Sequence, residues 1–486
     1  MSIKKNFIYN VIYQILLMIL PLITTPYISR VIGVKGIGLY SYSYSIASYF
    51  TIFIMLGLNN YGNRTIAMAK ESREELSRTF SGIYITQLTC GLVLSAIYLL
   101  YSLFMASDHL LALIQFMYVL SAVLDINWFF FGLEQFKLTI TRNIVIKLTT
   151  TGCIFLFINS DQDIYRYCLI MSAGILASQI SIWPFVRRHA VLIKVAPSEV
   201  IQHFKPNIVL FIPVVAISLY KILDKIMLGI LSNMNEVGYY ECSEKLISIP
   251  VALINALGIV MLPRMSSLVS KGKKEETLNY IRISLIFASF ISSALAFGIC
   301  SVIREFVPLF YGNGYDRCIQ LINILMIATI FLSWANVIRT QYLIPNKLDS
   351  IYIESVFLGA VVNIIINLFM IPYFRSTGAA IGTVCAESIV CIFQFCAVSK
   401  EIPIMKYCKE SVAFLFIGAA MLVCLRLVPM PITDPLLLIV VKAIIGGVFY
   451  LSISWLYLKG MVSSTGLQNY SQSFKRKIKT CYKRKK

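Results

Sequence analysis

The stretch that decides the fold is residues 217–248, ISLYKILDKIMLGILSNMNEVGYYECSEKLIS. Two apolar segments meet in it at a short polar turn, Ser232 to Gly238. Each segment carries three charged residues spaced three and four apart, so each trio shares one helix face. The trios are Lys221, Asp224 and Lys225 on the first segment, and Glu241, Glu244 and Lys245 on the second. Together their formal charges sum to zero.

An antiparallel helical hairpin would place these two charged faces side by side. At 1.5 Å per residue, we expect Asp224 near Glu244 and Lys245, roughly 10 Å below the turn. If both helices cross a membrane, the charges lie inside the bilayer, where each costs at least about 2.5–3.5 kcal/mol unless it pairs or faces water. The trios therefore form either a closed ion-pair network joining the two helices or the wall of a polar pathway.

The composition of the whole chain supports the membrane interpretation. Of 486 residues, 58% are hydrophobic and 14% are charged, against roughly 25% charged in soluble domains. Apolar windows of about 20 residues recur along the entire length, which predicts an all-α polytopic membrane protein. The runs are too long, and alternate too little, for a transmembrane β-barrel. We expect about fourteen spans, at residues 7–29, 39–58, 80–104, 109–131, 141–158, 165–186, 206–231, 237–262, 280–303, 317–339, 351–372, 377–398, 409–428 and 436–458.

The net charge of +20 would indicate nucleic-acid binding in a soluble protein, but its placement indicates membrane topology. With the N-terminus inside, most Lys and Arg fall in cytoplasmic segments and in the basic tail. The outward segments carry few, namely Arg30, Lys35, Arg166, Arg304, Arg317 and Arg375. The positive-inside rule therefore places both termini in the cytoplasm, and the first span reads as uncleaved because no small-residue cleavage site follows it.

Cofactor chemistry has no signature in the sequence. The twelve cysteines form no CxxC pair and lie mostly within spans, where they are small buried hydrophobes. We expect no disulfide, no metal and no cofactor. A nucleotide-binding motif is also missing, so ATP is not the expected energy source.

Two further charged residues are site candidates outside the hairpin. Arg30 ends a first span that contains Pro21 and Pro26; it is either a snorkelling anchor or a ligand for an anion. Asp125 is an isolated acid about two turns inside the fourth span. A buried carboxylate of this kind is protonated or paired, so Asp125 has either a structural hydrogen bond or a role in proton handling.

A weak internal repeat has an offset of 200 residues. Gly38, Tyr40 and Ser43 match Gly238, Tyr240 and Ser243, and the matches Arg64 with Arg264 and Glu75 with Glu275 follow. Six spans separate the copies, so both have the same membrane orientation, as in transporters built from parallel repeats. We therefore expect a six-helix lobe at 1–205, a second at 206–400, two additional spans at 401–460 and a basic cytoplasmic tail at 461–486.

Several stretches, in order along nearly the whole chain, carry a family resemblance. They are NVIYQ (10–14), PLITTPYISRVIGVKGIGLYSYSYSI (21–46), GLNNYGNRTIA (57–67), DINWFFFGLEQF (125–136), LDKIMLGIL (223–231), VGYYE (237–241), FYGNGY (310–315) and QYLIPNKLDS (341–350). The chain resembles Wzx-type flippases, the polysaccharide transporters of the MOP superfamily that move lipid-linked O-antigen or capsule repeat units.

This resemblance implies a MATE-like V of two six-helix lobes plus two extra spans. It also implies a cationic central cavity for the pyrophosphate of an undecaprenyl-linked oligosaccharide, worked by alternating access. The related peptidoglycan-precursor flippases keep cations on the first, second and eighth spans. Here Arg30 and Lys245 stand on the first and eighth, whereas the second span has no buried cation.

We therefore expect a flippase, not an enzyme, in the bacterial cytoplasmic membrane. Lys221, Lys225 and Lys245 are the candidates for an anion-attracting wall, joined by Arg30. The acids Asp224, Glu244, Glu241 and Asp125 are candidates for two roles. They would either keep those cations from binding the phosphate too tightly or carry a coupling proton. The expected partners are the lipid-linked oligosaccharide, the bilayer, and the polysaccharide polymerase and chain-length machinery.

Two alternatives remain from the sequence. A multidrug exporter of the same superfamily would hold cationic drugs with acids such as Asp125, Glu354 and Glu387. A membrane-embedded glycan polymerase or ligase would need a catalytic platform outside the membrane. The longest outward loop, Arg304–Asp316, has only about thirteen residues, which disfavours the enzyme.

Overall fold

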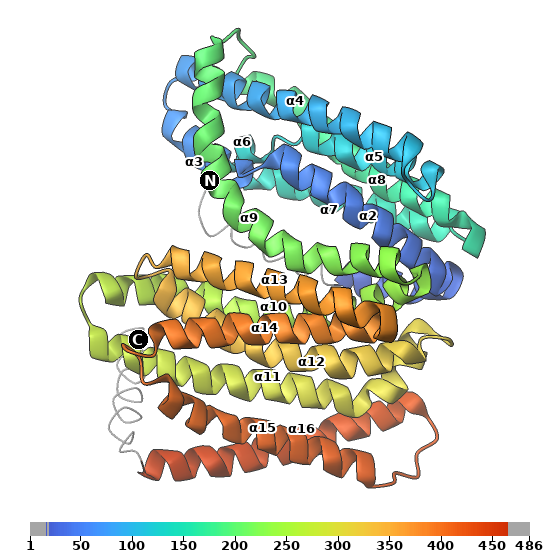
Figure 1. The fold of residues 1–486 in the computed structure, drawn as a ribbon, viewed down its shortest axis with the longest axis vertical. Helices are drawn as coiled ribbons and strands as arrows, with labels where there is room; N and C mark the ends of the chain where they lie inside the picture. Colours follow the sequence, from blue (N-terminus) through green and yellow to red (C-terminus); the bar gives the residue numbers. More distant parts are fainter. Residues whose placement is uncertain (1–15, 17–18, 465–486) are drawn as a thin grey trace, which may run out of the picture. The chain divides into compact units, whose positions relative to one another are not determined.

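The computed structural model describes residue 16 and residues 19–464, and the described chain is built from helices joined by short connections (Figure 1). Residues 7–15, 17 and 18 of the expected first span, 7–29, lie outside the described residues, as do residues 465–486 of the tail. Within the described part, twelve helices are long and apolar enough to cross a membrane. A thirteenth is α9, which bends by 45° between Ile212 and Val214. Every expected span from the second onward falls on one of these helices, so the all-α multi-pass architecture is confirmed.

The helices follow one another with few irregular residues. They are α2 (Gly33–Met55), α3 (Leu58–Ala69), α4 (Arg73–Phe104), α5 (His109–Val123), α6 (Asn127–Gly132), α7 (Phe136–Phe157), α8 (Ile164–Ile182), α9 (Pro197–Leu231), α10 (Met234–Ser270), α11 (Lys274–Tyr311), α12 (Asp316–Ile338), α13 (Asp349–Phe374), α14 (Ser376–Val398), α15 (Ile404–Leu427) and α16 (Pro435–Ser464). Short 3₁₀ segments flank α8, and a π-helical turn, Arg339–Leu343, follows α12.

Local signals explain where these helices start. The Ser72 hydroxyl accepts a hydrogen bond from the Glu75 amide, and Asp108 accepts one from the Leu111 amide at 2.9 Å. Both are N-caps, which satisfy amides that the first helical turn leaves unpaired. Residues 59–79, which connect the expected spans 39–58 and 80–104, are largely helical, because their apolar residues pack inward. A Cβ at Gly62 would lie 2.6 Å from the Trp128 ring, so α3 lies tightly against α6.

The turn of the charged hairpin is shorter than the sequence pattern predicts. Helix α9 ends at Leu231 and α10 begins at Met234, so the helix already includes most of the expected turn, Ser232 to Gly238. The reason is a cap: the side-chain oxygen of Asn233 accepts a hydrogen bond from the Glu236 amide at 3.1 Å. This shift of the turn changes which charged residues of α9 and α10 face each other.

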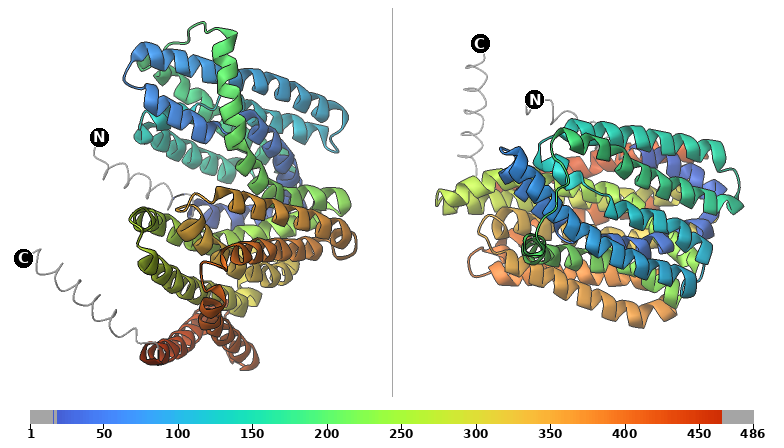
Figure 2. Two further views of the ribbon diagram at one scale, coloured as in Figure 1. Left: turned by 60° about the vertical axis from the view of Figure 1, so that its left-hand side comes forward. Right: turned by 90° about the horizontal axis from the view of Figure 1, so that it is seen from above.

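The chain divides into two compact units. Unit 1 comprises Met1–Ile249, Phe310–Ala328 and Asp349–Ile392, and unit 2 comprises the remaining residues. In unit 1, α5 packs against α2, α4 and α8, and α9 runs beside α13 (Figures 1 and 2). Its aromatic core includes the fully buried Phe80, Trp128 and Phe129. The Trp128 indole donates to the Gln87 side chain at 3.0 Å, so the DINWFFFGLEQF stretch helps build this core.

Unit 2 has its own core around α11, α15 and α16. Phe414, Met421 and Tyr450 are buried there. Two ion pairs tie its helices together: Arg282 with Glu410, and Lys442 with Glu305, each at 2.6 Å. All four side chains are less than one-fifth exposed. Because each of these cations has a carboxylate partner, they read as structural pairs.

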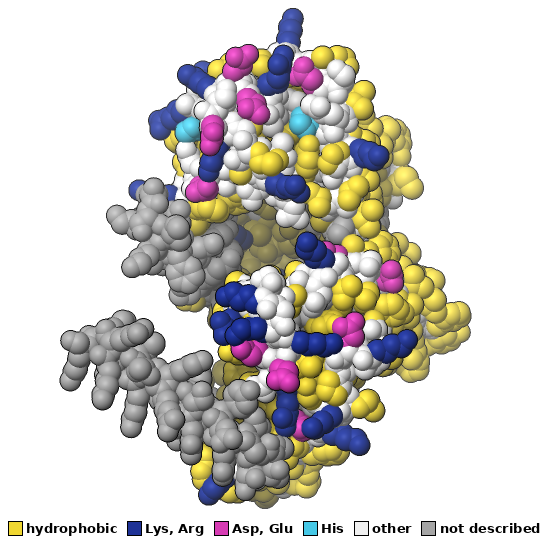
Figure 3. Space-filling model, turned by 90° about the vertical axis from the view of Figure 1, so that its left-hand side faces the viewer, with side chains coloured by type: hydrophobic (Ala, Val, Ile, Leu, Met, Phe, Trp, Pro, Cys, Tyr) yellow, Lys and Arg dark blue, Asp and Glu magenta, His cyan; other side chains and the backbone are white. Residues whose placement is uncertain are grey.

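Basic side chains are numerous at the helix ends that Figure 3 faces. They alternate with fewer acidic side chains, and hydrophobic side chains flank them. Helix ends rich in basic residues are typical of a membrane boundary.

Candidate functional site

The candidate site lies in unit 1, where α2 and α10 cross at two glycines. A Cβ built on Gly38 would lie 1.7 Å from the Met234 carbonyl oxygen, and one on Gly238 would lie 2.1 Å from the Val34 carbonyl oxygen. Both distances are far below any non-bonded contact, so only glycine permits this crossing. These two glycines are equivalent positions of the 200-residue repeat, and the structure brings them together.

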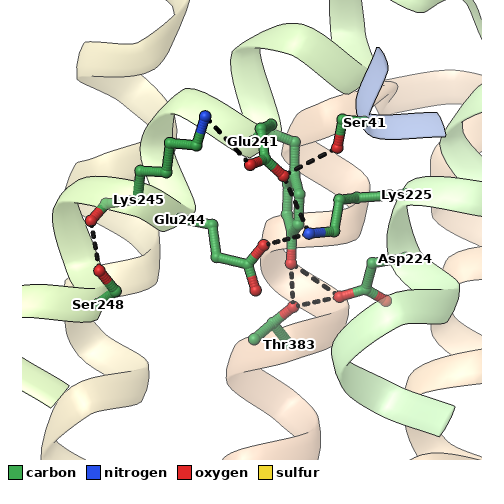
Figure 4. Close-up of polar contacts among 9 residues, drawn as sticks. Ser41, Asp224, Lys225, Glu241, Glu244, Lys245, Ser248 and Thr383 are labelled. Atoms are coloured by element: carbon green, nitrogen blue, oxygen red, sulfur yellow. Dashed lines mark hydrogen bonds and ion pairs between the residues drawn. The ribbon is translucent and has the colours of Figure 1, made fainter. Parts of the chain in front are cut away.

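Next to this crossing, Lys225 lies between two carboxylates of α10 (Figure 4). Its ammonium nitrogen is 2.9 Å from Glu241 and 2.9 Å from Glu244. Glu241 is also 3.4 Å from the Lys245 ammonium and accepts a hydrogen bond from the Ser41 hydroxyl at 2.8 Å. One carboxylate thus connects α2, α9 and α10. We call these five residues the Lys225 cluster; its formal charge is zero.

Asp224 faces a different set of partners. Its carboxylate accepts hydrogen bonds from the Tyr240 hydroxyl at 2.7 Å, the Thr383 hydroxyl at 2.8 Å and the Asn367 amide at 2.6 Å. Only 1% of the residue is exposed. All three donors are neutral, and no Lys or Arg of the described chain forms an ion pair with Asp224. Asp224 is therefore a buried carboxylate held by hydrogen bonds from α10, α13 and α14.

The expected register, with Asp224 beside Glu244 and Lys245, is thus wrong. The interhelical ion pairs belong to Lys225, while Asp224 contacts Tyr240. The physical reason is the Asn233 cap: an earlier start of α10 brings residues nearer to the turn opposite Asp224. Four of the other five expected charges do assemble, because Lys225 contacts Glu241 and Glu244, and Lys245 contacts Glu241.

The Lys225 cluster has a buried side and an accessible side. The side chains of Lys225 and Glu241 are 15% and 17% exposed, whereas those of Lys245 and Glu244 are 39% and 41% exposed. A closed network would bury all four charges. Instead, an anion and a cation at the edge of the cluster remain accessible.

The remaining sequence candidates lie apart from these contacts. Lys221 is exposed on α9, on the same face as Lys225 and one turn away from it. Arg30 is exposed, donates to the Pro26 carbonyl at 3.0 Å and passes close to Gly312. Asp125 lies at the break between α5 and α6, where its carboxylate accepts the Asn127 amide at 2.9 Å. None of these contacts joins Arg30 or Asp125 to the Lys225 cluster.

Sequence reasoning missed a second buried acid at the start of α10. Glu236 is 6% exposed and accepts hydrogen bonds from the amide and the hydroxyl of Ser376 at the start of α14. Arg317 and Arg375 lie 3.8 and 3.9 Å from it. In the sequence, all four residues (Glu236, Arg317, Arg375 and Ser376) lie at the outward ends of expected spans. This shared location was the signal that could have indicated their contact.

A row of tyrosines lies in the same unit. Tyr167 of α8 contacts Tyr40 edge-on at 4.9 Å between ring centroids; Tyr40 stacks on Tyr44 at 5.6 Å, and Tyr44 stacks on Tyr118 of α5 at 4.8 Å. The Tyr167 hydroxyl is within electrostatic range of Lys245 and Glu241. These rings combine apolar faces with polar hydroxyls, and they form a continuous row from α8 through α2 to α5.

Comparison with known proteins places the chain in a family. The family described as "Polysaccharide biosynthesis protein" matches residues 3–269. A "Putative O-antigen transporter" of Escherichia coli (strain K12) is 24% identical over 396 residues, covering 80% of this chain and 95% of that relative. A protein of the same description from Shigella dysenteriae is 22% identical over 399 residues, covering 81% of this chain and 100% of that relative.

Two solved structures share the fold. "Lipid II flippase MurJ, inward closed conformation" superposes with a TM-score of 0.77 at 15% identity, covering 94% of this chain and 100% of that one. An inward-facing multidrug resistance MATE family transporter of the MOP superfamily gives a TM-score of 0.57 at 14% identity, covering 80% and 99%. The all-α membrane fold inferred from the sequence is thus confirmed, and the family match and the O-antigen transporter relatives confirm the resemblance to polysaccharide transporters.

Proposed function

Because this chain belongs to the polysaccharide biosynthesis protein family, we propose that it is a flippase for an isoprenoid-pyrophosphate-linked oligosaccharide. Its substrate would be an undecaprenyl-linked repeat unit of O-antigen, capsule or exopolysaccharide. The protein would work by alternating access in a bacterial cytoplasmic membrane, with both termini in the cytoplasm. The family match, the O-antigen transporter relatives and the fold shared with a lipid II flippase support this proposal.

The accessible edge of the Lys225 cluster is the observation that carries the proposal. Lys245 and Glu244 are about two-fifths exposed although they lie in an apolar helix that qualifies as a membrane span. Facing hydrocarbon would cost each charge at least about 2.5–3.5 kcal/mol. The surface that they occupy therefore fits water and a charged substrate better than lipid tails, which is what a glycan pyrophosphate requires.

The four cations take different roles in this proposal. Lys225 is neutralised by two carboxylates at 2.9 Å, so it holds α9 to α10. Lys245 has a longer contact of 3.4 Å with a single carboxylate, and a phosphate oxygen can compete for it. Lys221 and Arg30 are exposed cations. They can bind the pyrophosphate before or after it reaches Lys245.

Asp224 is our candidate for a coupling proton. It is buried, accepts three hydrogen bonds from neutral donors and forms no ion pair among the described residues. A carboxylate without a cation can take up a proton without leaving a partner charge exposed. Because its donors come from α10, α13 and α14, the protonation of Asp224 would alter how these helices pack.

The test is depletion of the protein in its native cell. We expect lipid-linked repeat units to accumulate on the cytoplasmic leaflet and surface polysaccharide to disappear. Leaflet assignment by a membrane-impermeant glycan label separates this result from the enzyme alternative. Repeat units that reach the outer leaflet but stay unpolymerised would refute the flippase and favour a polymerase or ligase.

A further inference from the structure

A polar cavity of ≈ 190 Å³ lies between α7 and α8 of unit 1 and shares no residue with the Lys225 cluster. On each of the two helices the lining positions recur at three- and four-residue spacing, so two facing helix surfaces form its walls. The lining consists of Asn127, Arg142, Asn143, Ile146, Lys147, Thr150, Met171, Gly174, Ile175, Ser178 and Gln179. One water needs about 10–15 Å³ of such space, so the cavity accommodates a much larger polar group.

The charges of this cavity have one sign. Arg142 and Lys147 line it, and none of its eleven lining residues is an acid. The Arg142 guanidinium donates to the side-chain oxygens of Asn127 and Asn143, both at 2.8 Å. These two amides orient the guanidinium. The Asp125 carboxylate in turn accepts a hydrogen bond from the Asn127 backbone amide at 2.9 Å.

Lys147 is hard to explain by folding alone. It lies near the middle of α7, eleven residues after Phe136 and ten before Phe157, so its head group is far from either helix end. The described chain offers it no carboxylate: Lys147 takes part in none of the ion pairs that the structure contains. A cation at this depth normally pairs, faces water or serves a ligand.

The surroundings favour a lipid over a free anion. Val145 and Leu148 flank Lys147 on α7 and are 54% and 50% exposed, so an apolar surface adjoins the cationic cavity. Arg142 and Lys147 are five residues apart, about 7.5 Å along the helix axis. That spacing lets a guanidinium and an ammonium flank one anion with several oxygens, and both groups are typical phosphate ligands.

We propose that this cavity binds the phosphate of a lipid headgroup, with an isoprenoid pyrophosphate as the preferred lipid. The preference rests on the proposed function, since the flippase would meet this headgroup as its substrate. The cavity is a second anion site on the N-terminal helices, separate from Lys245. An anionic phospholipid offers the same phosphate chemistry, so the experiment must distinguish these two sources.

The test measures lipid binding to the purified full-length protein by native mass spectrometry. Undecaprenyl pyrophosphate and phosphatidylglycerol are titrated separately and then in competition. The variants are Lys147→Gln and Arg142→Gln, with Lys147→Arg to retain the charge. Lys137→Gln is the matched control, because Lys137 is exposed on the same helix but does not line the cavity.

Losing a hydrogen bond to a charged group should weaken undecaprenyl pyrophosphate binding by roughly tenfold or more in Lys147→Gln. Lys147→Arg and Lys137→Gln should bind nearly as the unmodified protein does. Binding of phosphatidylglycerol alone, with the same dependence on Lys147, would retain the phosphate site and count against the flippase substrate. If Lys147→Gln and Lys137→Gln bind each of the two lipids with equal affinity, the inferred site is refuted. This result would not depend on whether the proposed function is correct.

Discussion

The glycine crossing of α2 and α10 yields the sharpest prediction, Gly38→Ala. The added methyl carbon would lie 1.7 Å from the Met234 carbonyl oxygen. An ordinary carbon–oxygen contact is about 3.3–3.6 Å, so the two helices must separate locally by nearly 2 Å. Overpacking of this kind costs about 1–3 kcal/mol. The conformation in which α2 and α10 cross closely should therefore be destabilised by that amount. The free energy of conformations that lack this close crossing should not change.

In an alternating-access protein, this penalty becomes a population shift. A change of about 1–3 kcal/mol multiplies the ratio of open to closed crossings by roughly 5–150-fold. Cys318 is a natural probe for the opening of the crossing between α2 and α10. It is fully buried, and its thiol lies 3.5 Å from the carbonyl oxygen of Tyr239 on α10. We expect maleimide labelling of Cys318, mapped by mass spectrometry, to accelerate in Gly38→Ala. The unfolding midpoint should fall at the same time.

Gly152→Ala on α7 is the matched control. A Cβ at Gly152 meets nothing within 4 Å, and alanine is favoured over glycine inside a helix by roughly 0.5–1 kcal/mol. This variant should keep or raise the unfolding midpoint and leave Cys318 protected. If Gly38→Ala matches Gly152→Ala in both the labelling rate and the unfolding midpoint, the close crossing does not restrain the protein.

Four other predictions concern the charges and the topology. Lys225→Ala leaves Glu244 without its cation and Glu241 with only Lys245, a loss of about 3–5 kcal/mol, so the protein level should fall, while Lys225→Arg should restore it; an unchanged level in Lys225→Ala would contradict the structural role. Lys245→Gln should keep the protein level and lose surface polysaccharide, and normal export from it would remove Lys245 from the substrate path. Asp224→Asn should fold but export substrate independently of an imposed pH gradient, measured in vesicles; a retained gradient dependence would exclude Asp224 as the proton carrier. Reporter fusions after Gln162 should lie outside and those after Lys273 inside, and two fusions on one side would break the proposed topology.

The sequence was sufficient for features that depend on local pattern. Apolar runs of helical length located the spans, and the three- and four-residue spacing of Lys225, Glu241, Glu244 and Lys245 put their charges on facing surfaces. The exact register was not predictable in the same way. It depends on one capping side chain, Asn233, which starts α10 within the expected turn.

Contacts between distant segments were beyond the sequence pattern. Asp224 is held by Asn367 and Thr383, which lie more than a hundred residues away in the chain. A signal existed, because Asn363 and Asn367 are polar residues four apart in the otherwise apolar stretch 356–374 of α13, and buried amides need partners. Pattern alone did not identify which acid they would meet. Lys147 lies inside the expected span 141–158, and a lysine in the middle of an apolar run was the signal that could have identified it.

The missing cation of the second span has a steric explanation. Equivalent positions of two repeats can touch only near the axis that relates them, and Gly38 meets Gly238 while Ser41 meets Glu241 at the same offset of 200 residues. At such a crossing, α2 has room only for small side chains. A lysine or arginine at position 41 would have to displace the short hydrogen bond to Glu241. The charge at this crossing is therefore supplied by α9 and α10, and α2 contributes a hydroxyl donor. The departure from the cation pattern of the peptidoglycan-precursor flippases thus follows from helix packing, and in the proposed function Lys221 and Lys245 would supply the cations of the path instead.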